Sequence, residues 1–269
     1  MPAAASSAGE PDASGGSPVT AGWTEVGDRV FVRRHRELDL NCGLVVGEGA
    51  CLVIDTRSHL GEGRALAEAV RTVTPHPWTV VNTHAHHDHC FGNAAFRPAP
   101  IWAHRDCAVE LGATAEQQRA SVVADLLAAG DPDAELVATT PVELPDHLVG
   151  DRVVLDVGGR AVSLRHLGRG HTGADLVVGV DDVLFAGDLV EEGAPPAMDD
   201  AYPLEWADTV TALLGLVRGP VVPGHGAVVD AAFVAAQRDD LAALADWLTG
   251  RSAGLAFDEP TRRTARTRL

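Results

Sequence analysis

A run of histidines and an aspartate directly after a short apolar segment constrains this 269-residue chain more than any other feature. Residues 79–82 (Thr-Val-Val-Asn) lead into the spacing His-x-His-x-Asp-His, made by His84, His86, Asp88 and His89. Side chains two apart in an extended segment share a face, so His84 and His86 can hold one cation. Asp88 and His89 lie where the chain turns into a helix and can hold a second cation. Imidazole and carboxylate groups together suit zinc, iron, manganese or cobalt, whereas the alternative is a polar loop with Asp88 as a helix N-cap.

Three later segments each place one further ligand-type side chain at or near a strand end. His171 lies between glycines in Gly-His-Thr-Gly, Asp188 ends Val-Leu-Phe-Ala-Gly-Asp, and His225 lies in Val-Val-Pro-Gly-His-Gly. Each of them alone is more often a turn residue. Together with the first run they complete a set of donors for two metal ions, which predicts one site assembled where strands end.

Short apolar runs rich in β-branched residues alternate with helical patterns along the chain. Strands are predicted at 30–32, 44–46, 52–54, 79–81, within 153–185 and at 221–222, and helices at 63–73, 105–136 with a break at Gly130 and Pro132, 204–217 and 230–248. Both halves have strands followed by a helix, which predicts an α/β fold of two β-sheets packed face to face with helices outside. Residues 1–17 are predicted to be a disordered leader, and residues 18–269 a single domain with a C-terminal helix and a short basic tail.

Composition and charge exclude several classes of protein. Apolar residues make up 46% of the chain, but no apolar run approaches the ~20 residues of a membrane span, so a membrane protein is excluded. The formal net charge is −17 and the sequence contains no lysine, which argues against a nucleic-acid partner. The basic cluster in the last eight residues is interpreted as a solvated tail; it comprises Arg262, Arg263, Arg266 and Arg268.

The cysteines and the N-terminus indicate a reducing compartment. The four cysteines, Cys42, Cys51, Cys90 and Cys107, form no Cys-x-x-Cys pair and are expected to be reduced, mostly buried thiols. The first 20 residues have neither the positively charged start nor the apolar stretch of a secretory signal. We therefore expect a cytoplasmic protein, while its oligomeric state stays open.

The His84-x-His86-x-Asp88-His89 run, followed in order by His171, Asp188 and His225, is similar to that of the metallo-β-lactamase-fold hydrolases. This superfamily includes glyoxalase II and quorum-quenching lactonases. The resemblance covers nearly the whole chain, from the strand that holds Asp55 to His225, and all seven ligand positions match. It implies an αβ/βα sandwich of two mixed sheets with the metal site at one sheet edge.

The same resemblance implies a role for each of these residues. His84, His86 and His171 would bind the first metal ion, Asp88, His89 and His225 the second, and Asp188 would bridge the two. Two zinc ions per chain are implied, with iron or manganese as alternatives, and a bridging hydroxide would attack the substrate carbonyl. Asp88 would also orient this hydroxide as the catalytic residue. Asp55 is a candidate acceptor for the second nitrogen of a ligand imidazole, against the alternative of a turn aspartate.

Departures from known members of the superfamily narrow the substrate. Asp188 stands where true β-lactamases have cysteine or serine, and Glu191 stands where lactonases often have tyrosine. Glyoxalase II holds glutathione through basic residues of a C-terminal helical domain, whereas the 44 residues that follow His225 here contain no lysine, so we do not expect a glutathione thioester as substrate. We predict a hydrolase of a small acyl substrate, namely an ester, thioester, lactone or amide, with residues 190–203 as one pocket wall or else a plain connecting loop. The alternative is an iron-dependent oxidoreductase of the same fold, similar to persulfide dioxygenases.

Overall fold

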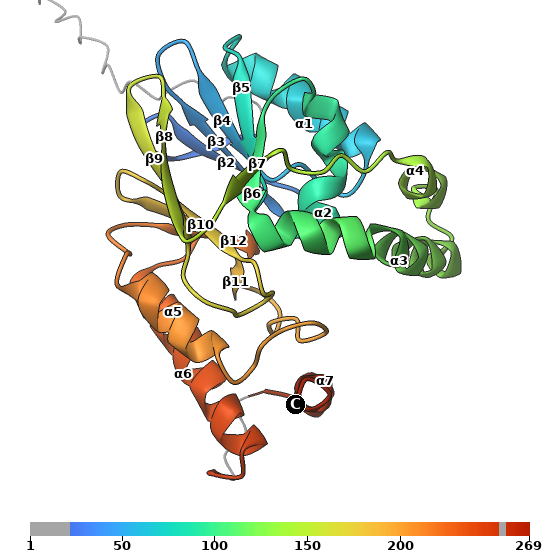
Figure 1. Ribbon diagram of the computed structural model, residues 1–269, viewed down its shortest axis with the longest axis vertical. Helices are drawn as coiled ribbons and strands as arrows, with labels where there is room; N and C mark the ends of the chain where they lie inside the picture. Colours follow the sequence, from blue (N-terminus) through green and yellow to red (C-terminus); the bar gives the residue numbers. More distant parts are fainter. Residues whose placement is uncertain (1–21, 253–256) are drawn as a thin grey trace, which may run out of the picture.

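The described chain forms two β-sheets that pack face to face, with helices on both outer sides (Figure 1). A computed structural model describes residues 22–252 and 257–269. The predicted leader, residues 1–17, lies outside the described residues. The arrangement of sheets and helices confirms the predicted α/β sandwich.

The first sheet has seven strands that follow one another in chain order. They are β1 (Thr24–Gly27), β2 (Val30–Arg34), β3 (Asn41–Val46), β4 (Cys51–Ile54), β5 (Trp78–Val81), β6 (Ile101–His104) and β7 (His147–Val149). β1 to β4 form an antiparallel meander, whereas β4 to β7 pair in parallel. Parallel neighbours need a crossover, which α1 (Leu60–Val73) provides between β4 and β5. The carboxyl ends of β4 and β5 therefore meet at one edge of the sheet.

The second sheet has five strands in the order β12-β11-β10-β9-β8. Their bounds are β8 (Arg152–Val157), β9 (Arg160–His166), β10 (Leu176–Val180), β11 (Val183–Glu191) and β12 (Val221–His225). β8 to β11 are antiparallel, and β12 pairs with β11 in parallel after a crossover through α5 (Trp206–Leu214). The carboxyl ends of β11 and β12 thus also lie side by side, and α6 (Ala231–Leu248) follows β12.

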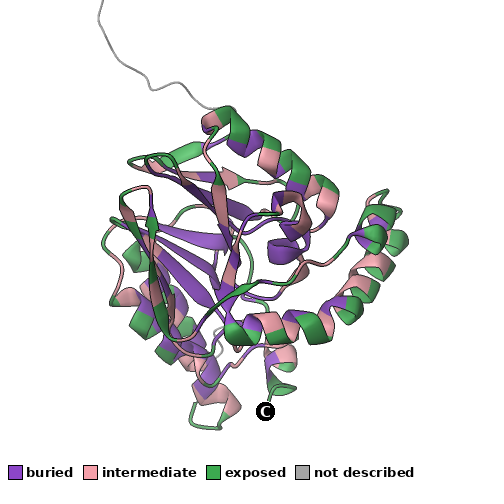
Figure 2. Ribbon diagram, turned by 45° about the horizontal axis from the view of Figure 1, so that its top comes forward, coloured by how far each residue is buried: buried purple, intermediate pink, exposed green. Residues whose placement is uncertain are grey.

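The central strands β3, β4, β10 and β11 are buried on both faces, which is why they appear in the sequence as nearly continuous apolar runs. In β4, Leu52 and Ile54 belong to the core between the sheets, while Val53 faces the core under α1. In β10, Val178 faces the opposite sheet and Val177 the core under α5 and α6. Successive side chains of a strand point to opposite faces, so these central strands contribute to two cores. Figure 2 shows the resulting buried strands.

The long helix predicted at 105–136 is two helices in the structure, divided at the predicted break. α3 (Arg105–Ala129) ends at Gly130, which has a left-handed φ of 68°, and α4 (Ala134–Thr139) follows. Only the first half of α3 has buried residues, so its second half and α4 project as an arm beside the sheets (Figures 1 and 2). Arg119 Nη1 donates to three carbonyls at the end of α4 and ties the arm together.

The basic C-terminal residues, interpreted from the sequence as a solvated tail, form a short helix instead. α7 (Glu259–Arg266) begins after Asp258, whose side chain accepts a hydrogen bond from the N–H of Thr261. Ala265 is buried, and Arg268 donates to the carbonyls of Asp200 and Ala201. The segment therefore packs on the loop that follows β11.

The four cysteines are buried and free, as predicted. Within the described residues, no helix combines the length and the apolar character that crossing a bilayer requires.

Candidate metal centre

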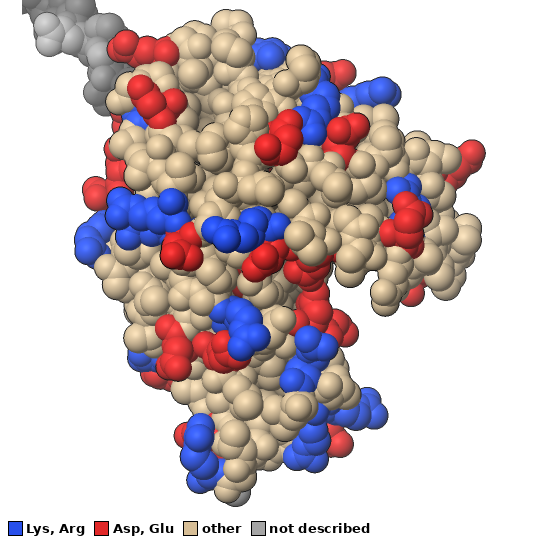
Figure 3. Space-filling view, viewed as in Figure 1, with Lys and Arg blue, Asp and Glu red and all other residues tan. Residues whose placement is uncertain are grey.

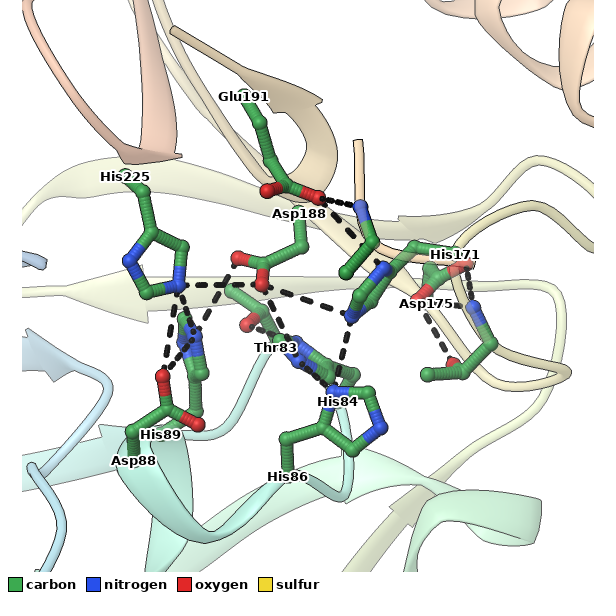
Figure 4. Close-up of polar contacts among 12 residues, drawn as sticks. Thr83, His84, His86, Asp88, His89, His171, Asp175, Asp188, Glu191 and His225 are labelled. Carbon is green, nitrogen blue, oxygen red and sulfur yellow. Dashed lines mark hydrogen bonds and ion pairs between the residues drawn. The ribbon is translucent and has the colours of Figure 1, made fainter. Parts of the chain in front are cut away.

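The structure brings all seven predicted ligand residues together at one edge of the two sheets (Figure 4). His84, His86, Asp88 and His89 lie in the turn that follows β5 and in α2 (His87–Cys90). His171 lies between β9 and β10, Asp188 lies in β11, and His225 ends β12. The first group of donors comprises His84, His86, His171 and Asp188, and the second comprises Asp88, His89 and His225.

In the first group, three ring nitrogens converge on one point. His86 Nδ1 lies 3.0 Å from His84 Nε2 and 2.9 Å from His171 Nε2. Asp188 Oδ2 lies 3.7 Å from His84 Nε2 and 3.5 Å from His171 Nε2. Three imidazoles and one carboxylate at such spacings form a donor set that a divalent transition metal prefers.

The second group lies against the same aspartate. His225 Nε2 is 3.4 Å from His89 Nε2 and 3.4 Å from Asp88 Oδ2. Asp188 is 3.3 Å from His89 Nε2 through Oδ1 and 3.2 Å from His225 Nε2 through Oδ2. Asp188 therefore lies between the two groups, and its side chain is within 3.7 Å of a nitrogen in each.

The outer nitrogens of four imidazoles already donate hydrogen bonds, which leaves their inner nitrogens as lone-pair donors. His89 Nδ1 donates to Asp55 Oδ2 (2.8 Å) and His225 Nδ1 to the carbonyl of Leu38 (2.7 Å). His86 Nε2 donates to Asp200 Oδ2 (2.8 Å). His84 Nδ1 donates to Thr83 Oγ1 (3.0 Å) because that hydroxyl itself donates to Asp55. Asp188 Oδ1 is buried and has no hydrogen-bond partner within the described chain. These residues fit a metal ion.

Asp55 supports the site from the end of β4. Its backbone adopts a left-handed φ of 61°, which aspartate tolerates better than most residues. The carboxylate accepts hydrogen bonds from the N–H and the hydroxyl of Thr83, both at 2.8 Å, as well as from His89. Asp55, the candidate acceptor suggested by its place at a strand end, is therefore a buried carboxylate that accepts a hydrogen bond from His89.

Replacing Asp55 with asparagine should weaken metal binding. The amide can present its NH2 group to His89 Nδ1, and the ring would then turn its hydrogen toward the inner nitrogen. Loss of such a supporting carboxylate typically lowers metal affinity by ~10- to 100-fold. Competition with a chelator of known affinity measures the change, and Asp156→Asn, on exposed β8, is the matched control. Unchanged affinity in Asp55→Asn would show that Asp55 has no such role.

The charges around the site set the protonation of the metal-free protein. Burial lowers the pKa of His171 to about 4, so this ring is neutral. Burial also opposes a charge on His225, but Asp188 and Asp88 outweigh it and raise the pKa of His225 to about 12. In the same way Asp200 raises the pKa of His86 to about 9 against the effect of burial. In the metal-free protein, the protons on His86 and His225 therefore offset carboxylate charges that bound cations would otherwise offset.

A pocket of about 750 Å³ opens over both groups of donors. Residues 191–195, 197, 199 and 200 line it, which supports the predicted wall in 190–203. Glu191 is buried, its Oε1 accepts from the N–H of Ala197 and lies 3.8 Å from His171 Nδ1, and burial raises its pKa to about 8. Figure 3 shows acidic side chains at the hollow beneath the arm.

Sequence reasoning left some contributors unidentified. Asp200 lies far along the chain from His86, and no spacing rule links the two. The carbonyl of Leu38, which holds His225, carries no sequence signal at all. In contrast, His104 and His166 stack on each other at 4.4 Å and belong to neither group of donors.

Comparisons with known proteins agree with this geometry. The sequence profile of the metallo-beta-lactamase superfamily matches residues 36–225. No curated protein matches the chain.

Solved structures share the fold. A metallo-beta-lactamase from Pontibacter korlensis is 19% identical with a TM-score of 0.61, covering 81% of this chain and 98% of its own. The mono-zinc form of the metallo-beta-lactamase FIM-1 from Pseudomonas aeruginosa is 20% identical with a TM-score of 0.58, covering 82% and 95%. A double mutant of the sec-alkyl sulfatase PisA1 is 16% identical with a TM-score of 0.74; the match covers 92% of this chain but 49% of the sulfatase.

Proposed function

Because this chain belongs to the metallo-beta-lactamase superfamily, we propose that it is a hydrolase that uses two zinc ions to cleave a small acyl substrate. The substrate class is an ester, thioester, lactone or amide. The observation that carries the proposal is the convergence of seven donor side chains in two adjacent groups, with Asp188 between them, at the floor of one pocket.

Each donor has a role in this proposal. His84, His86 and His171 would hold one ion, Asp88, His89 and His225 would hold the other, and Asp188, which lies between the two groups, would serve both. When bound, a pair of divalent cations lowers the pKa of water and polarises the carbonyl that is attacked. Asp55, Thr83, Asp200 and the Leu38 carbonyl fix the ring orientations through the hydrogen bonds described above.

Asp88 is the residue that orients the attacking water. Burial would raise its pKa, but His89 and His87 outweigh burial and hold it well below its usual range. The carboxylate is therefore ionised at neutral pH and accepts hydrogen bonds. It lines the pocket, so a substrate that enters there meets a water held by this carboxylate.

The charge of the pocket supports a neutral or cationic substrate. Its lining contains seven carboxylates and, among the described residues, no arginine; they are Asp39, Asp88, Asp188, Glu191, Glu192, Asp199 and Asp200. Glu191 is mostly protonated at neutral pH because burial raises its pKa to about 8, and Asp39 is paired with Arg34. Two divalent cations would offset four of the five remaining negative charges, so the pocket has no excess positive charge that would attract an anion. Polyanions such as nucleic acids, and sulfate esters of the kind named for PisA1, are therefore disfavoured.

The test combines metal analysis with a substrate panel. We expect close to two zinc ions per untagged chain, and turnover of activated esters, thioesters or lactones with little cleavage of phosphodiesters, RNA, DNA or alkyl sulfates. Efficient metal-dependent cleavage of a nucleic acid, with every acyl substrate inert, would contradict the proposal. Tightly bound iron together with oxygen consumption on a persulfide would identify an oxidoreductase instead.

Metal binding should weaken as the pH falls. His86 and His225 have raised pKa values of about 9 and about 12, so both hold protons at pH 7 in the metal-free protein. A cation needs neutral imidazoles and must displace these protons, so the apparent affinity falls ~10-fold per pH unit for each proton displaced. Calorimetry in buffers of different ionisation enthalpy counts the protons released. An affinity that stays constant from pH 8 to pH 6, without proton release, would rule out these ligands.

A further inference from the structure

A second cavity, of about 510 Å³, lies between the α3 and α4 arm and the loop before α1. Its apolar lining comes from Leu38, Val122, Leu126, Ala129 and Val137. Leu38 and His87 line both this cavity and the pocket over the metal centre, so the two spaces adjoin. We name this second cavity the side groove; its volume is in the range of small-molecule sites.

His59 provides an unused hydrogen-bond donor in the side groove. Its Nδ1 accepts from the N–H groups of Gly61 and Glu62 at the start of α1, so the hydrogen of the neutral ring is on Nε2. The residue is 5% exposed, and Nε2 has no hydrogen-bond partner in the described part of the chain. Its neighbouring carboxylate oxygens, on Glu62 and Asp133, are each 3.9 Å away, beyond hydrogen-bond distance. A buried donor in this state favours a ligand that brings an acceptor.

The charges at the side groove restrict what kind of acceptor can enter. The buried guanidinium of Arg57 pairs with Glu37 and Glu62 and so offsets one of the two negative charges of these groove-lining glutamates. Three further carboxylates in the lining have no such cation, and no arginine is among the described lining residues; these are Asp125, Asp131 and Asp133. An anionic ligand group would be repelled, so the acceptor is an oxygen of an uncharged group.

We propose that the side groove binds the distal part of the acyl substrate, an uncharged apolar chain with an oxygen that accepts a hydrogen bond from His59 Nε2. The inference rests on the proposed hydrolysis, since the groove adjoins the pocket where the acyl group would react. This proposal narrows the substrate class to acyl compounds that carry a long uncharged chain, in preference to acyl compounds that are short or anionic.

Two neighbouring leucines of α3 allow a matched kinetic test. Leu126 lines the groove, whereas Leu127 is exposed and does not. With zinc-loaded full-length protein, Leu126→Gln should raise KM for 4-nitrophenyl octanoate roughly ten-fold, because apolar contacts to the chain are lost. This ester has no distal oxygen for His59 and so tests the apolar part of the groove alone. KM for 4-nitrophenyl acetate should change less than two-fold, and Leu127→Gln should alter neither. Equal effects on both esters, or none on the octanoate, would overturn the groove assignment.

A binding experiment separates this inference from the proposed hydrolysis. 2-Octanone combines a neutral acceptor oxygen with an apolar chain, and its titration should shift amide NMR signals of α3 and of residues 58–62. His59→Asn keeps a good helix N-cap, but its amide NH2 group is on a shorter side chain and ends one bond short of the position of Nε2. It should therefore weaken 2-octanone binding several-fold without lowering the melting temperature. Binding at these residues while every ester is inert would refute the hydrolysis alone. Ester turnover without chain-length dependence or 2-octanone binding would refute the groove alone.

Discussion

Asp188→Ala should bind at most one zinc ion per chain and lose turnover by more than ~100-fold, while its helix content stays unchanged. The side chain lies between the two groups of donors, 3.2 Å from His225 Nε2 and 3.5 Å from His171 Nε2. In the proposed site, two ions would lose their common ligand without this carboxylate, and the cleft would lose a charge that offsets them. Metal analysis after gel filtration, circular dichroism and ester turnover measure the three quantities.

Two further variants separate charge from shape. Asp188→Asn keeps the size of the side chain but removes its negative charge, so it should resemble Asp188→Ala in metal content. Asp182→Ala, at the exposed turn before β11, should retain full metal and rate. Full loading and normal turnover in both Asp188 variants would remove Asp188 from the site.

Much of the fold could be predicted from the sequence because its central strands are buried on both faces. Runs such as Leu52 to Ile54 have no polar alternation, and Gly130 with Pro132 marks the break between α3 and α4. Short elements could not be predicted from the sequence because tertiary contacts stabilise them. α7 is an example: its apolar content is low, and it becomes a helix through the Asp258 cap and the burial of Ala265.

The donor side chains could be predicted from the sequence, whereas most of the groups that hydrogen-bond to their rings could not. The ligand-type residues stand out because four of them fall within residues 84–89 and three later strand ends repeat the pattern, although each alone would be an ordinary turn residue. The groups that hold those rings are ordinary in sequence, such as the carbonyl of Leu38 or the carboxylate of Asp200. Contacts across more than 100 residues of chain depend on how the two sheets pack, which spacing along one segment does not encode.

A single methyl group at Gly224 should disrupt the metal centre. A Cβ atom built on Gly224 would lie 1.7 Å from Asp188 Oδ1 and 2.9 Å from Asp188 Cγ. The carboxylate would have to move by more than ~1 Å, and displacements of that size at a reacting centre can cost ~100-fold in rate. Gly224→Ala should therefore lose metal and turnover nearly as completely as Asp188→Ala. Gly112→Ala is the matched control, since its new Cβ would meet only Leu144 Cδ1 at 3.7 Å, an ordinary contact.

Combining the two substitutions tests whether Gly224 acts through Asp188. If the clash with Asp188 is the cause, Gly224→Ala should lower the melting temperature of the metal-free protein when Asp188 is present, and much less in the Asp188→Ala background. The two effects on stability would then be strongly non-additive, as for side chains in direct contact. Additive effects would mean that Gly224 is required for another reason, such as the approach of its Cβ to the carbonyl carbon of Gly187 at 3.0 Å. Strong non-additivity would instead explain why glycine precedes His225: the carboxylate of Asp188 needs the space that a Cβ atom on Gly224 would fill.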